Sequence, residues 1–78
     1  MDIQKAKDYF KLGAITGASI QAASIMHPDG WTIEFSGKFG EANPLFETMR
    51  GEVRQFKTLD SCAKVLAEIG FKKWSVQL

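Results

Sequence analysis

The sequence has very few of the residues that metal sites, disulfides and nucleophilic catalysis require. It contains one cysteine, Cys62, and one histidine, His27. A single cysteine cannot form an internal disulfide, which indicates a reducing, cytoplasmic compartment. One His and one Cys cannot supply a four-ligand zinc site, and no carboxylates have the spacing of a calcium loop. We therefore predict no bound metal.

Long apolar runs and a surplus of one charge are also missing. No stretch approaches the roughly 18 apolar residues of a membrane-spanning helix. The opening MDIQKAKDYF is charged and amphipathic, unlike a signal peptide. Ten Lys and Arg against nine Asp and Glu give a formal net charge of +1. A clearly basic domain or stripe is typical of nucleic-acid binding. The net charge therefore favours neither a nucleic acid nor a membrane as partner.

What the sequence does contain is enough apolar surface for one small domain, residues 1–78. It is 45% hydrophobic, with six Phe, two Trp and one Tyr, which favours a folded domain over a disordered chain. A core of this size rarely supplies more than about 3–5 kcal/mol of stability. Dimerisation is one common way to add to that, so a homodimer is an open alternative.

Two segments have the apolar spacing and the end residues of amphipathic helices. The first covers residues 2–12, where Asp2 can cap the N-terminus and Gly13 follows the C-terminus. The second begins after Thr58, whose hydroxyl can accept from a free N–H of the first turn, and it ends at Gly70. The apolar stripe of the second helix is Leu59, Cys62, Ala63, Leu66 and Ile69.

Alternation of apolar and polar residues predicts extended structure elsewhere. The sequence HPDG at 27–30 predicts a tight turn between the first two strands, because Pro presets its own φ and Gly accepts a left-handed conformation. Gly37 and Gly40 predict a second turn. The predicted extended segments are residues 14–26, 31–36, 45–49, 53–56 and 74–78.

These elements predict an α+β domain in the order α-β-β-β-(short β)-α-β. Helices with one apolar stripe beside half-buried strands favour two layers, a mostly antiparallel sheet of about four to five strands with both helices on one face. If segments 53–56 and 73–78 lie parallel, the helix between them is a right-handed crossover. The sequence leaves the strand order open.

No catalytic constellation accompanies these elements. Cys62 lies on the apolar stripe of a helix, which favours a buried small side chain over a nucleophile. His27 precedes a proline in a turn, which favours an exposed position over a general base. The glycines around Lys38 match neither a phosphate-binding loop nor a dinucleotide fingerprint. We predict a protein that is not an enzyme and holds no cofactor, with an unrecognised active site as the third alternative.

One small basic set stands out from this pattern. Arg50, Arg54 and Lys57 lead into the free N–H groups of the helix that starts after Thr58. Arginines beside a helix N-terminus can bind a phosphate or the carboxylate of a partner. The alternative is that these are solvated positions, with much of their field cancelled by neighbouring acidic residues.

The segment RGEVRQFKTLDSCAKVLAEIGFKKWSVQL, residues 50–78, resembles small proteins carried on bacterial plasmids and other mobile elements. Such proteins are often labelled partition- or replication-associated. The opening DIQKAKDYFKLGAI and the Gly-Trp hairpin after it extend the resemblance over most of the chain. The resemblance implies a small accessory protein of the bacterial cytoplasm with no assigned activity. It offers only Arg50, Arg54 and Lys57 as candidate functional residues.

Our leading hypothesis is a non-enzymatic protein-interaction module that acts through a surface or a sheet edge. The missing catalytic constellation, the near-neutral charge and the many aromatic residues favour it. Its partner is an unknown protein or a second copy of the chain. The alternative is a nucleic-acid-binding accessory protein, in which the basic set converges with Lys38, Lys72 and Lys73.

Overall fold

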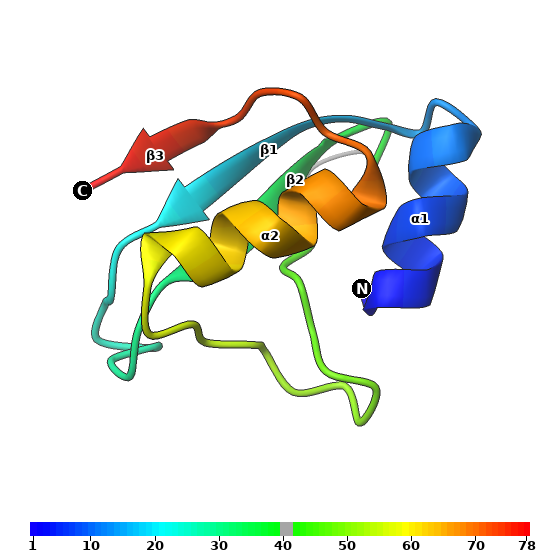
Figure 1. The fold of residues 1–78 in the computed structure, drawn as a ribbon. Coiled ribbons are helices and arrows are strands. Elements are labelled where there is room, and N and C mark those ends of the chain that lie inside the picture. The colour runs from blue at the N-terminus through cyan, green and yellow to red at the C-terminus, as the bar shows by residue number, and fades with distance from the viewer. Residues whose placement is uncertain (40–41) are drawn as a thin grey trace.

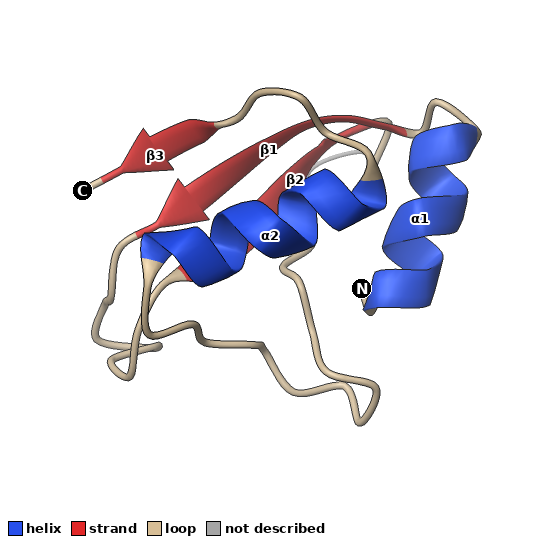
Figure 2. Ribbon diagram, in the orientation of Figure 1, coloured by secondary structure: helices blue, strands red, loops and turns tan. Residues whose placement is uncertain are grey.

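The computed structural model describes residues 1–39 and 42–78 and shows two helices and a three-stranded mixed sheet (Figures 1 and 2). The order α-β-β-α-β confirms the predicted α+β class. The elements are α1 (Ile3–Lys11), β1 (Ile15–Gln21), β2 (Thr32–Gly37), α2 (Leu59–Ile69) and β3 (Ser75–Gln77).

The central strand of the sheet is β1, in the order β2-β1-β3. It pairs antiparallel with β2, where Ile20 lies opposite Ile33, and parallel with β3, where Ile20 lies opposite Val76. Both isoleucines are buried. In Figure 1, α2 lies over β1 and β2, and β3 lies at the margin of the covered face. α1 packs beside the C-terminal end of α2 and the start of β1.

Both helices begin and end where the sequence predicts, because their end residues act locally. The Asp2 side chain accepts from the N–H of Lys5 at 2.9 Å. The Thr58 hydroxyl accepts from the N–H of Ser61 at 3.1 Å. Each bond satisfies an N–H that the helix itself leaves free. Gly70 ends α2 with φ of 131°, a backbone conformation that other residues rarely adopt.

The core lies between the sheet and α2 and is rich in aromatic rings. Phe35 of β2 is fully buried, and its ring lies parallel to that of Phe71 at 6.3 Å and edge-on to that of Phe46 at 6.2 Å. The largest fully buried side chains are Phe35, Ile20, Ile33, Leu66 and Cys62. The predicted apolar stripe of α2 is thus confirmed at Cys62, Leu66 and Ile69, while Leu59 is exposed.

The predicted sheet of four to five strands is wrong, because the described residues form three. Segments 45–49 and 53–56 are extended but make only isolated bridges, Glu34 with Leu45, Trp31 with Phe56 and Glu47 with Val53. Two separate segments share the short outer edge of β2, so neither builds a ladder of its own. Segment 53–56 therefore lies on the side of the sheet away from β3. Its bridge to Trp31 is antiparallel, so it runs in the same direction as β1 and β3, and α2 connects these two parallel outer segments.

Two further predictions need adjustment. The first strand ends at Gln21 instead of residue 26, and residues 22–31 form the connection to β2. The predicted alternation along β2 holds for buried Ile33 and Phe35, but Thr32, expected on the exposed face, is buried as well. The predicted turn at Gly37 and Gly40 lies partly outside the described residues.

Candidate interaction surface at the sheet edge

The structure distributes the predicted basic residues along a loop. Arg50 lies in the turn where the N–H of Gly51 donates to the carbonyl of Thr48 at 2.9 Å. In Figure 1 this turn is the tip of the long loop before α2, well away from the helix start. The guanidinium of Arg54 lies 5.0 Å from the centre of the Phe56 ring, a cation–π contact. Arg50 and Arg54 therefore occupy separate places in the loop, one in a turn and one against the Phe56 ring.

Lys57 and Thr58 do lie at the start of α2. Lys57 is exposed directly before the cap. The Thr58 hydroxyl accepts the Ser61 N–H and lies 2.9 Å from the Ser61 hydroxyl. This hydroxyl is already used in capping the helix. Of the four predicted residues, the structure thus brings two together at the helix N-terminus.

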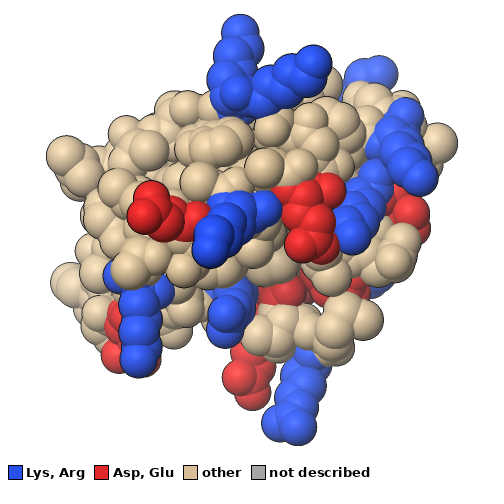
Figure 3. Space-filling model, viewed as in Figure 1, with Lys and Arg blue, Asp and Glu red and all other residues tan. Residues whose placement is uncertain are grey.

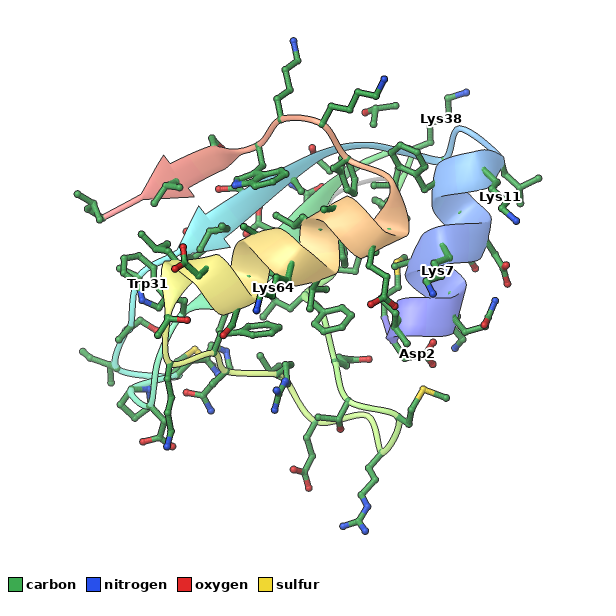
Figure 4. The ribbon with its side chains drawn as sticks, in the orientation of Figure 1. Asp2, Lys7, Lys11, Trp31, Lys38 and Lys64 are labelled. Atoms are coloured by element: carbon green, nitrogen blue, oxygen red, sulfur yellow. The ribbon has the colours of Figure 1, made fainter. Side chains whose placement is uncertain are left out.

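The outer face of α2 carries charges of both signs. Asp60, Lys64 and Glu68 are exposed at four-residue intervals, and Glu68 pairs with Lys7 of α1 at 3.0 Å. Figure 3 shows acidic and basic side chains alternating across α2, and Figure 4 shows Lys64 projecting from the helix. Mixed charge of this kind is typical of a solvated face. On this face it gives no basic stripe of the sort that nucleic-acid binding requires.

Cys62 and His27, the two residues considered for catalysis or metal binding, lie in the core and in a loop, respectively. Cys62 is fully buried in the core. The N–H of His27 donates to the hydroxyl of Ser24 at 3.2 Å within the loop before β2. Within residues 1–39 and 42–78, no three His, Cys, Asp or Glu side chains gather as metal ligands. No helix in the same residues is long and apolar enough to cross a membrane.

We expect the Cys62 thiol to be unreactive until the protein unfolds. Burial raises the pKa of the Cys62 thiol from 9.0 to about 11. Because the folded pKa lies above the unfolded value, the neutral thiol favours folding below pH 9.0, and this contribution is lost as pH rises through about 11. A thiol reagent at pH 8 should label Cys62 only as fast as the protein opens. Rapid labelling of the native protein, or a Cys62→Ala variant with the same loss of stability above pH 9, would contradict this expectation.

The outer edge of β2 is closed by the loop that follows it. Backbone hydrogen bonds of 2.7–2.9 Å connect this edge to the loop along most of its length. They join Trp31 with Phe56, Ile33 with Phe46, and Phe35 with Pro44. The loop therefore prevents another strand from pairing with this side of the sheet.

The outer edge of β3 is open. Its one neighbour in the described sheet is β1. The carbonyl of Gln77 accepts from the N–H of Ala22 at 3.0 Å, so the backbone groups of Gln77 face β1. Because alternate residues of a strand turn their N–H and C=O to opposite sides, those of Val76 face outward. The backbone groups of Trp74 and Leu78, two residues away on either side, have the same outward orientation as those of Val76. We call residues 74–78 the β3 edge.

Apolar side chains accompany these free backbone groups. Val76 lies opposite buried Ile20, so both project from the face of the sheet that α2 covers. Trp74 and Leu78, two residues away on either side, share that face. Trp74 packs partly against the core, whereas Val76 is 44% exposed and Leu78 is 99% exposed. The covered face thus ends in an apolar strip that α2 does not reach.

Other exposed apolar residues belong to segments at the end of the molecule where β1 and β3 end and α2 begins (Figure 1). Among the described residues, eight large hydrophobic side chains are exposed, and five of them belong to segments that meet at this end. The five are Ile25, Met26, Leu59, Val76 and Leu78.

Sequence reasoning named a sheet edge in general but did not identify this one. The available signal was the alternation of Trp74, Val76 and Leu78, which predicted a half-buried strand. Nothing in that pattern showed that β3 has a single neighbour, or that α2 stops short of it.

Comparisons with known proteins give this surface no counterpart. No family model matches the chain, no curated protein matches its sequence, and no solved structure matches it. The resemblance to plasmid and mobile-element proteins therefore stays a prediction.

Proposed function

We propose that this protein is a non-enzymatic interaction module that binds an extended segment of a partner protein along the β3 edge. The observation that carries the proposal is the contrast between the two sides of the sheet. The loop closes β2, while β3 presents free N–H and C=O groups with apolar side chains beside them. In strand addition, main-chain hydrogen bonds supply affinity and alternate side chains supply specificity.

The chemistry of the β3 edge supports this function. Natural sheets guard exposed edges with lysine, proline or an inward-pointing charge. The segment SVQL at 75–78 has none of these, and Lys72 and Lys73 precede it. An unguarded edge beside an apolar strip favours pairing with another chain over exposure to water.

Proline substitutions at Val76 and Gln77 test the free side and the paired side of β3 one at a time. We expect Val76→Pro to leave the fold intact, because it removes an N–H that faces outward, and proline is tolerated at such edge positions. The same change should abolish strand addition. Gln77→Pro is the matched control, since its N–H faces β1, and we expect it to destabilise the β1–β3 pairing.

Thermal unfolding of the two variants, with affinity capture by the wild type and Val76→Pro, tests this expectation. A partner that binds the wild type and not Val76→Pro, and that protects the Val76 amide from hydrogen exchange, supports the proposal. Equal binding by both proteins places the contact elsewhere and contradicts it. Equal destabilisation by both prolines would show that the Val76 N–H is not free.

A further inference from the structure

Resting on the proposed function, we infer that the partner at the β3 edge is a second copy of this chain, paired antiparallel about Val76. The dimer has a two-fold axis perpendicular to the sheet at Val76. It joins the two sheets into one of six strands, in the order β2-β1-β3-β3-β1-β2. Both α2 helices then lie on the same face.

The outward backbone groups fit this register. With the axis at Val76, Val76 of each copy lies opposite Val76 of the other, and Trp74 lies opposite Leu78. These residues have the phase that faces away from β1. In an antiparallel ladder, facing residues in this phase exchange both N–H···O=C bonds. A shift by one residue would place Ser75 or Gln77, whose backbone groups bond to β1, opposite Val76, and these bonds would be lost.

The closed edge of β2 determines the size of the assembly. A strand that pairs head to tail would need β3 of one copy against β2 of the next. The bonds from the loop to Trp31, Ile33 and Phe35 occupy that edge. The β3 edge can therefore pair with its own copy, and an interface that uses the same surface on both copies stops at two.

A second copy also covers the apolar strip. With neighbouring strands about 4.8 Å apart, the two β1 strands are about 14 Å apart across the interface. The α2 helices lie over β1 and β2, so they stand at least this far apart, whereas directly packed helices stand about 8–10 Å apart. The two helices therefore do not pack directly against each other, and the space between them is open to side chains of both copies. Val76 and Leu78 of both copies, 44% and 99% exposed, project toward this space.

The facing strands are also compatible in charge. Residues 74–78 carry no charged side chain, so the two-fold axis brings no like charges opposite one another. Ser75 and Gln77 point to the polar face, opposite to the apolar strip. The interface is small, under about 1,200 Å² in total, which is the size typical of weak or transient complexes.

Sedimentation equilibrium and amide hydrogen exchange by NMR test the inference on the wild-type chain. We expect a monomer at about 1 μM and a dimer approaching 1 mM, the range over which micromolar association saturates. The Val76 and Leu78 amides should exchange rapidly in the dilute protein and at least about tenfold more slowly in the concentrated one. The Gln77 amide should be protected at both concentrations.

Two lysine variants provide the matched comparison. Val76→Lys places two ammonium groups opposite each other and should weaken dimerisation about fivefold. Leu12→Lys adds the same charge at the end of α1, where Leu12 is 77% exposed, and should leave dimerisation unchanged. Far-UV circular dichroism confirms that both variants fold.

The remaining outcomes separate this inference from the proposed function. A monomer at every concentration, with rapid exchange at Val76, overturns self-pairing but leaves an open edge for another protein. A monomer with a protected Val76 amide overturns both proposals. A dimer that survives Val76→Lys with Val76 still exchanging rapidly has a different interface and overturns the self-pairing inference.

Discussion

Replacing Phe35 with alanine should unfold most of the protein at 25 °C. The Phe35 side chain is fully buried, and its ring packs against those of Phe46 and Phe71. Truncation of a buried phenylalanine to alanine costs about 3–5 kcal/mol, from lost transfer energy and the cavity that remains. The whole core of such a small domain supplies only about the same amount. Urea titration of the wild type, with near-UV circular dichroism of Phe35→Ala, measures the loss.

The matched control is Ile25→Ala, which also truncates a large apolar side chain but at a position that is 99% exposed. We expect it to change stability by less than about 0.5 kcal/mol. A native-like near-UV spectrum for Phe35→Ala, with a urea midpoint close to that of the wild type, would contradict the aromatic core described above.

Replacing Gly37 with alanine should have the second-largest effect. A Cβ at Gly37 would collide with the backbone carbonyl oxygen of Ala14, at a separation that real Cβ atoms essentially never show. This oxygen also accepts the N–H of Lys38 at 3.0 Å where β1 and β2 begin to pair. The collision is with backbone, so a side-chain rotation cannot relieve it. We expect a loss of about 3 kcal/mol, at the upper end for overpacking.

Gly51→Ala is the control for conformational strain without a collision. Gly51 has φ of 88° in an exposed turn, and a Cβ there would meet nothing within 4 Å. The cost should be the steric cost of the left-handed backbone alone, about 1–2 kcal/mol. Urea midpoints compare the two variants, and exchange of the Lys38 amide should accelerate in Gly37→Ala only. Equal losses in the two variants would show that β1 and β2 do not approach each other as described.

Dimerisation through the β3 edge should also change how strongly these core substitutions destabilise the protein. If the dimer forms, the β3 edge adds backbone hydrogen bonds and apolar burial to a core that has little reserve. Destabilised variants should then recover part of their stability at high protein concentration, because association favours the folded state by mass action. Val76→Lys combined with a core variant should show no such recovery.

Local features of the fold could be predicted from the sequence because their causes lie within a few residues. Asp2, Thr58 and Gly70 act on backbone groups at most four positions away, and the structure confirms all three. The apolar stripe of α2 was predicted from spacing alone, and it fails only at Leu59, in the first turn. The sequence contains no recognisable catalytic constellation, and the conclusion that the protein is not an enzyme remains a prediction.

The pairing of strands was decided by tertiary structure. Segments 45–49 and 53–56 have the alternation of strands, but whether an extended segment becomes a strand depends on how much free edge its neighbour offers. The short edge of β2 is divided between them. The distribution of Arg50 and Arg54 follows from the same division, because the Arg54 N–H donates to the carbonyl of Phe46 within the loop that closes β2, and Arg50 lies in the turn after Thr48.

The sequence by itself determined that the last strand is apolar on one face, through the alternation of Trp74, Val76 and Leu78. Only the tertiary structure decided that this strand lies at an edge, with the groups of Val76 facing outward and Val76 and Leu78 beyond the reach of α2. Alternation depends on one residue and its neighbours in the chain. An open edge depends on where β1, β2 and α2 lie, and those positions are set by long-range packing.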